Sequence, residues 1–180
     1  MTSCPVCSLP IISPSGNPNS TILLIGEFPG DEEMKVGLPF VGKAGHVLRQ
    51  EFYREKVDYK RLRITNLWLH PKHTAASRKK EDQKLAAELN ENCLKYFMEC
   101  LLKEANGKKA ILLIGSDAVK TLTGKSVSAW AGLRMTSDYL DPPLLMCSVN
   151  PASVYHVPLG ETRLSIHKFV REMKRAGYYE

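Results

Sequence analysis

The sequence predicts an α/β fold, a three-layer α/β/α sandwich around a mostly parallel four-stranded sheet. Two observations predict it. Apolar runs typical of buried strands alternate with helical patterns along the chain, and two of these runs end alike, at a glycine that leads toward a helix. The predicted strands lie within 22–25, 62–69, 110–115 and 142–151. The predicted helices cover 46–56, 81–104, 117–122 and 161–175.

The first strand and the glycine-rich loop after it organise the rest of the chain. Residues 22–25 are four unbroken apolar residues, and Gly26, Glu27 and a Pro-Gly turn follow at once. The stretch 31–45 then leads into the first helix. Because ligands of open α/β sheets bind outside the carboxyl ends of the strands, Glu27 stands where a site would be built. A solvated acidic loop is the ordinary alternative, but the glycines allow close approach of the backbone to a ligand.

Apolar periodicity predicts which helix faces are buried. The inward positions predicted for the long helix are Leu85, Leu89, Cys93, Phe97 and Leu101. Those predicted for the last helix are Leu164, Phe169, Val170 and Met173. At the strand ends, Asn66 and Asn150 are predicted to converge with Glu27 at one edge of the sheet, where they would form a small polar pocket.

Length and charge bound the function. The chain has 180 residues, which predicts a single domain over 1–180, and we expect a monomer. The net charge of +6 permits a nucleic-acid partner without requiring one. No stretch approaches the roughly 20 apolar residues that span a membrane, so no membrane partner is expected. The first residues lack the features of a signal peptide, which makes an intracellular protein with reduced or metal-bound thiols the default.

The N-terminal segment 1–21 is predicted to be a loop-like metal-binding segment packed on the domain. Cys4 and Cys7 form a CxxC motif, and three prolines and one glycine follow it within 8–21. No helical pattern continues from the motif. A thioredoxin-like CxxC should open a helix within a βαβ unit. A metal clip is therefore the better interpretation.

Three motifs resemble those of the family 4 uracil-DNA glycosylases. Residues 26–33 with 37–45 look like the first motif, 64–66 like the second, and 148–153 occupy the place of the last. The similarity runs over nearly the whole chain. It implies a DNA glycosylase that acts on uracil or a related modified pyrimidine in DNA by base excision, leaving an abasic site.

The resemblance also implies roles for single residues. Glu27 would position water and offset positive charge on the sugar, and Asn150 would support the departing base. Asn66 would read the base, because one amide matches a carbonyl beside an N–H. Phe40 would stack on the ring. The other residues expected to bind the base are Gly26, Phe28 and Glu33.

Each role has an ordinary alternative. Asn66 could bond local backbone, and without the family pattern that interpretation would be preferred. Phe40 could belong to the core, the commoner fate of an aromatic residue. Glu33 sits in an acidic run that could simply be solvated.

The sequence departs from the family pattern at two pocket positions. Asn150 stands where the family usually has His, and the bulky Phe28 stands where the family residue is small or polar. Two rival functions stay open for these reasons. One is a glycosylase specific for a bulkier or hypermodified base, and the other is a metal-bearing module that binds DNA without turnover.

Cys4, Cys7 and Cys93 are similar to ligands of the family's [4Fe-4S] cluster, and His70 falls at the place of the remaining cysteine. Three thiolates and one imidazole would equally suit structural zinc. The ordinary alternatives are a loop histidine for His70 and a core thiol for Cys93. His73 matches poorly the histidine of relatives that capture DNA covalently, so covalent capture is not expected.

The remaining expectations concern thiols and phosphates. Cys100 and Cys147 are predicted to be core thiols without ligand duty. The predicted contacts to the DNA backbone are Lys43, Arg78, Lys79 and Lys80, with Lys168, Arg171, Lys174 and Arg175 as further candidates. Charges of this kind more often form a solvated face.

Overall fold

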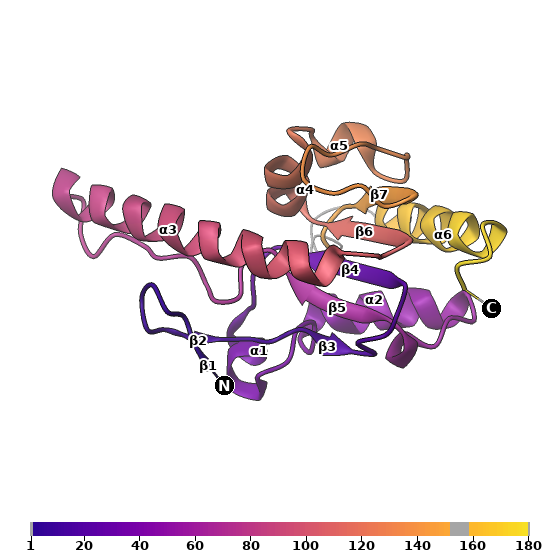
Figure 1. Ribbon diagram of the computed structural model, residues 1–180, viewed down its shortest axis with the longest axis horizontal. Coiled ribbons are helices and arrows are strands. Elements are labelled where there is room, and N and C mark those ends of the chain that lie inside the picture. The colour runs from indigo at the N-terminus through magenta and orange to yellow at the C-terminus, as the bar shows by residue number, and fades with distance from the viewer. Residues whose placement is uncertain (1, 152–158, 180) are drawn as a thin grey trace.

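The computed structural model describes residues 2–151 and 159–179 and contains a central five-stranded sheet in the order β3-β5-β4-β6-β7 (Figure 1). The four strands expected from the sequence are β4 (Ile22–Gly26), β5 (Arg63–Asn66), β6 (Ala110–Ile114) and β7 (Leu144–Ser148). Neighbours among these four pair in parallel. The predicted α/β fold with a mostly parallel sheet is confirmed.

The fifth strand, β3 (Ser15–Gly16), was not expected and pairs antiparallel with β5. The N-terminal segment also contains a two-stranded hairpin, β1 (Thr2–Ser3) and β2 (Pro10–Ile11). The prediction of a purely loop-like 1–21 was wrong in this respect, because strands of two residues are too short to carry an apolar alternation.

Helices cover both faces of the sheet, as Figure 1 shows. The helices α2 (Lys43–Arg54) and α6 (Leu159–Arg175) contribute buried side chains to one core cluster. The helices α3 (Lys80–Ala105), α4 (Ser116–Thr123) and α5 (Val127–Trp130) pack against the other cluster.

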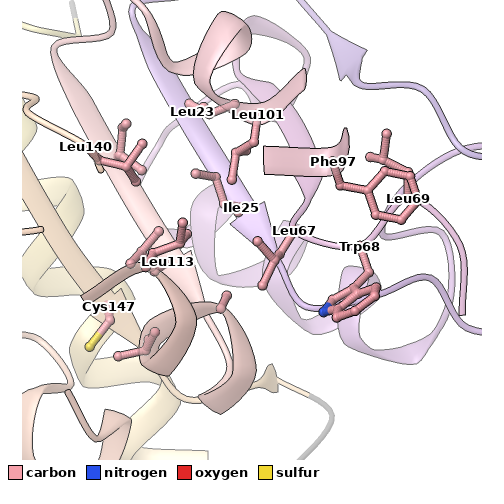
Figure 2. Packing of buried hydrophobic residues seen from close by; sticks show 14 of the residues in the cluster. Leu23, Ile25, Leu67, Trp68, Leu69, Phe97, Leu101, Leu113, Leu140 and Cys147 are labelled. Atoms are coloured by element: carbon pink, nitrogen blue, oxygen red, sulfur yellow. The ribbon is translucent and has the colours of Figure 1, made fainter. Parts of the chain in front are cut away.

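The strand β4 explains why two cores form. Its residues alternate between the faces, so Leu23 and Ile25 belong to the cluster under α3 and α4 while Ile22 and Leu24 belong to the one under α2 and α6. Figure 2 shows Leu23 and Ile25 beside Leu101 in the first cluster. A strand buried on both faces needs the unbroken apolar run that the sequence shows.

The loop after β4 contains helical structure that the sequence did not predict. The stretch 31–45 contains a short helix, α1 (Asp31–Val36), and α2 begins at Lys43, three residues before the predicted start. Gly42 is the N-cap of α2, and no side chain caps it. Sequence patterns miss such a start because Gly42 and Gly45 are poor helix formers. A 3-10 turn, η1 (Tyr59–Arg61), precedes β5.

Two predicted core residues are exposed. Leu85 is 58% exposed because the N-terminal half of α3 extends beyond the sheet, whereas Phe97 and Leu101 in the C-terminal half are buried (Figure 1). Leu164 in α6 is 56% exposed, and Ile166 is fully buried instead.

Among the described residues, no helix combines the length and the apolar character that crossing a bilayer requires.

Candidate active site

A cavity of about 320 Å³ opens at the carboxyl edge of the sheet, beside α1 and the start of α2. Its lining includes the four residues predicted to gather there, namely Glu27, Phe40, Asn66 and Asn150. Glu27 and Asn66 follow or end the neighbouring strands β4 and β5, and Asn150 comes two residues after β7. The parallel topology therefore brings together residues from distant parts of the chain.

Both carboxylate oxygens of Glu27 accept hydrogen bonds. The backbone N–H of Asp117, in the first turn of α4, donates to Oε1 at 2.8 Å. The side-chain amide of Asn150 donates through Nδ2 to Oε2 at 2.7 Å. Each carboxylate oxygen keeps a second lone pair, so the group can still accept a hydrogen bond from a water molecule. The carboxylate is thus fixed in orientation and still able to bind water.

Asn66, Gly26 and Phe40 form one wall of the cavity. Asn66 is only 5% exposed, at the last position of β5. A Cβ atom added at Gly26 would lie 2.4 Å from Oδ1 of Asn66 and 2.5 Å from Cζ of Phe40. Only glycine allows the amide and the ring to approach the strand this closely. The pairing of a buried amide with an aromatic ring suits recognition of a flat polar molecule.

The backbone of Phe40 is held in an unusual conformation. Its φ is 56°, in the left-handed region that residues other than glycine rarely adopt. Its carbonyl oxygen accepts a hydrogen bond of 2.6 Å from Nη1 of Arg49 in α2. A Cβ atom at Gly45 would lie 1.7 Å from the same oxygen, so Gly45 leaves the room for this turn. These contacts direct the ring of Phe40 to the cavity.

Glu33 also lines the cavity, but its carboxylate is engaged with the loop itself. Its oxygens accept hydrogen bonds from the backbone N–H groups of Gly42 at 2.8 Å and Gly30 at 3.1 Å. The side chain therefore ties the start of α1 to the start of α2. Its predicted contact with a base stays a prediction.

Phe28 and Lys43 lie at the same cavity. Phe28 is 50% exposed, so its ring is available to a ligand. Of the residues predicted to contact phosphates, Arg78, Lys79 and Lys80 are instead exposed at the start of α3, the end of the helix that projects from the body in Figure 1.

The last predicted motif is only partly described. Asn150 and the buried Pro151 belong to the described residues, whereas Ala152 and Ser153 lie outside them.

Three residues that position the site were not singled out from the sequence. Gly115 has a φ of 98°, and a Cβ atom there would lie 2.3 Å from Cδ of Glu27. Its position directly after an apolar strand is a signal from which the sequence could have identified it. Arg49 and Asp117 act through one hydrogen bond each, with the Phe40 carbonyl and the Glu27 carboxylate. No local pattern marks them.

The second chemical feature is a group of potential metal ligands formed by Cys4, Cys7, His70 and Cys93, none of which lines the cavity. Their ligand atoms lie within 4.8 Å of one another. Cys4, His70 and Cys93 are buried. The group joins the turn between β1 and β2, the loop after β5, and α3.

The ionisation of the thiols depends on their surroundings. Burial raises the pKa of Cys93 to about 12. Burial also opposes ionisation of Cys4, but hydrogen bonds from the backbone N–H groups of Val6 and Cys7 and from the thiols of Cys7 and Cys93 together outweigh it and lower its pKa. Thiolates are the metal-binding form, so a bound cation would supply the charge compensation that Cys93 lacks.

The donor set fits a metal, but its spacing does not fit a [4Fe-4S] cluster. Sγ of Cys4 lies 3.8 Å from Sγ of Cys93, and Sγ of Cys7 lies 3.3 Å from Nε2 of His70. The four ligands of such a cluster bind four different irons, so their ligand atoms lie farther apart than ligand atoms that share one ion. The family's cluster would require these segments to move apart.

The chain is similar in sequence to known proteins. The family model described as the uracil DNA glycosylase superfamily matches residues 13–174. A type-4 uracil-DNA glycosylase of Thermotoga maritima is 45% identical over 40 residues. That match covers 22% of this chain and 21% of the relative. From the family match over most of its length, together with the fold, the chain belongs to the uracil DNA glycosylase superfamily.

Proposed function

We propose that the protein is a DNA glycosylase that hydrolyses the N-glycosidic bond of uracil or a related modified pyrimidine in DNA and leaves an abasic site. One observation carries the proposal: Glu27, Phe40, Asn66 and Asn150 line a single cavity in a chain of this superfamily. A volume of about 320 Å³ is small for a ligand site and suits an extruded base more than a large cofactor.

In this proposal the extruded base stacks on Phe40 and is read by Asn66. The amide carries both an acceptor and a donor, which complement an N–H beside a carbonyl on the base. The burial of Asn66 excludes competing water and makes a mismatched partner costly. Gly26 allows both contacts on one base.

Bond cleavage builds positive charge on the sugar and negative charge on the departing base. Glu27 would orient the attacking water and offset the positive charge. Asn150 would hold Glu27 in position through its hydrogen bond to that carboxylate. The second N–H of its amide would donate a hydrogen bond to the departing base. A metal held by Cys4, Cys7, His70 and Cys93 would have a structural role here, since these residues do not line the cavity.

The direct test uses labelled oligonucleotides that contain one uracil, incubated with the protein and then cleaved with alkali at abasic sites. We expect strand cleavage with the wild type and none with Glu27→Ala. Tight, salt-sensitive binding without base release, unchanged in Glu27→Ala, would support the non-catalytic module instead.

A second candidate is a glycosylase for a bulkier or hypermodified base. The observation that favours it is Phe28, whose ring is half exposed at the cavity. A panel of oligonucleotides with modified pyrimidines separates the two. Inactivity on uracil together with activity on one substituted base would favour the second candidate.

A further inference from the structure

We propose that Cys4, Cys7, His70 and Cys93 bind a single tetrahedral zinc ion, in place of the [4Fe-4S] cluster that the resemblance to family 4 enzymes implies. The inference concerns the ligand spacing of this chain. It does not depend on the proposed glycosylase activity.

Two of the distances between ligand atoms are close to those expected around one ion. Bonds of about 2.3 Å to sulfur and about 2.0–2.1 Å to nitrogen place tetrahedral ligand atoms roughly 3.5–3.8 Å apart. The Cys4 to Cys93 sulfur distance is 3.8 Å, and the Cys7 sulfur to His70 nitrogen distance is 3.3 Å. The largest separation within the set stays within 4.8 Å. The ligands of a cluster would have to lie farther apart, because each binds its own iron.

The histidine is oriented for a metal. Nδ1 of His70 lies 2.6 Å from the carbonyl oxygen of Pro71, so Nδ1 carries the proton and donates it. Nε2, the atom near Cys7, is left with its lone pair toward the set. Metal-bound histidines commonly use one nitrogen for the metal and the other for such a hydrogen bond, which fixes the tautomer and the ring.

The cysteines lie in a turn shaped around their sulfur atoms. The N–H of Cys4 donates to the carbonyl of Leu9 at 2.8 Å, and the N–H of Ser8 donates to the carbonyl of Cys4 at 2.8 Å. Ser8 has a φ of 63°, a left-handed residue that closes the turn directly after Cys7. Three thiolates with one imidazole form one of the common structural zinc sets.

Zinc at this place would add direct bonds among three segments that already pack in one hydrophobic cluster. The hairpin of β1 and β2 would be tied to the loop after β5 and to α3, in place of the larger core that a short hairpin cannot build. This predicts a folding role for the ion and no electron transfer.

The first experiment identifies the metal without measuring activity. The protein is purified without oxygen from cells supplied with both iron and zinc, and zinc, iron and acid-labile sulfide are measured per chain. We expect one zinc, no stoichiometric iron or sulfide, and a colourless solution. X-ray absorption should show sulfur at about 2.3 Å and nitrogen at about 2.0–2.1 Å from zinc. Iron with sulfide and a broad absorbance near about 400 nm would overturn the proposal, as would the absence of any bound metal.

Two cysteine variants on the same helix provide a matched pair. Cys93→Ser removes a ligand, whereas Cys100→Ser changes a half-buried thiol of α3 outside the set. We expect Cys93→Ser to lose at least tenfold in zinc affinity against a chromophoric chelator, and Cys100→Ser to keep the wild-type affinity. Equal affinities in the two variants would contradict the assignment.

Hydrogen exchange tests the site even where a variant fails to fold. Removing zinc from the wild type with a chelator should speed exchange at the amides of Cys4 and Ser8, and zinc should restore protection. The amides of β6, an inner strand of the sheet, serve as the control and should change little. Unchanged exchange at Cys4 and Ser8 would contradict a zinc ion at this turn.

Discussion

Asn150 donates a hydrogen bond of 2.7 Å from Nδ2 to Oε2 of Glu27, although the two residues are 123 positions apart in the sequence. They meet because β4, β6 and β7 lie side by side and run parallel, so the chain leaves all three strands at the same edge of the sheet. The N–H of Asp117 holds the other oxygen of Glu27. The carboxylate is thereby oriented before any ligand binds, which is the kind of arrangement that catalysis by a charged group requires.

Glu27→Gln tests the need for this carboxylate. The new amide would present an N–H group to either the Asp117 amide or the Asn150 amide, both of which are donors. We expect kcat for base release to fall by about a hundredfold or more, because charge and orientation are lost together. Single-turnover base release measures it. Glu99→Gln, an exposed substitution on α3, should keep wild-type rates.

Asn150→Asp tests whether the partner of Glu27 must be neutral. Two carboxylates at the present 2.7 Å separation would repel one another, and one of them would resist ionisation. We expect activity well below that of the wild type at neutral pH, with partial recovery as the pH falls, since the new carboxyl group can donate to Glu27 once it is protonated. The ratio of variant to wild-type rate between about pH 5 and pH 8 measures the effect. A ratio independent of pH would argue against the contact.

Gly26→Ala tests the wall of the cavity. The added Cβ would lie 2.4 Å from the Asn66 amide oxygen and 2.5 Å from the Phe40 ring, so both side chains would have to shift. We expect kcat/KM to fall by about a hundredfold through misplacement of the base, with the far-ultraviolet circular dichroism unchanged. Gly160→Ala in α6 has no neighbour within 4 Å of its Cβ and should behave as the wild type. Normal activity of Gly26→Ala would remove Asn66 and Phe40 from base recognition.

The sequence predicts those features that follow from apolar runs and parallel topology. The strand β4 and the convergence of Glu27, Asn66 and Asn150 follow from such signals, since parallel strands end at one edge. Periodicity could not show that Leu85 is exposed. A repeat of four residues identifies the apolar face of a helix, but it does not say how far along the helix the sheet beneath that face extends.

Contacts made by the backbone are the part that sequence patterns miss. The left-handed turn at Phe40 depends on Arg49 and on the missing side chain of Gly45, and neither residue has a local signature for that purpose. The edge strand β3 depends on Gly16, where a Cβ atom would lie 2.0 Å from the carbonyl oxygen of Leu62.

Tyr59 provides a prediction on stability that is independent of function. Among the described residues, its buried hydroxyl has no hydrogen-bond partner, and burial raises its pKa. Removing an unsatisfied hydroxyl should be neutral or stabilising, so Tyr59→Phe is expected to raise the free energy of unfolding by up to about 1 kcal/mol. Tyr179→Phe is the contrasting control, because that hydroxyl accepts a 2.7 Å bond from the N–H of Asp58. Its loss should lower the free energy of unfolding by about 1 kcal/mol, as denaturant titration can measure.

The ion pair between Arg63 and Glu104 predicts a pH dependence of stability. The guanidinium donates two bonds, of 2.8 and 2.9 Å, to the two carboxylate oxygens, and this hydrogen bonding lowers the pKa of Glu104 although burial opposes it. A carboxyl whose pKa is lower in the folded state stabilises the fold above its unfolded pKa of about 4.3 and loses that contribution as the pH falls through the folded value.

We therefore expect Glu104→Gln to reduce the free energy of unfolding by about 1 kcal/mol at pH 7, a value kept small because part of the pair is exposed to solvent. The difference from the wild type should shrink below about pH 4, where the wild-type carboxyl is protonated as well. Urea unfolding of both proteins at several pH values measures this. Glu91→Gln removes an exposed ion pair with Lys95 and should leave the stability unchanged at every pH. A Glu104→Gln deficit that stayed constant down to low pH would mean that packing, and not charge, accounts for the contribution of this side chain.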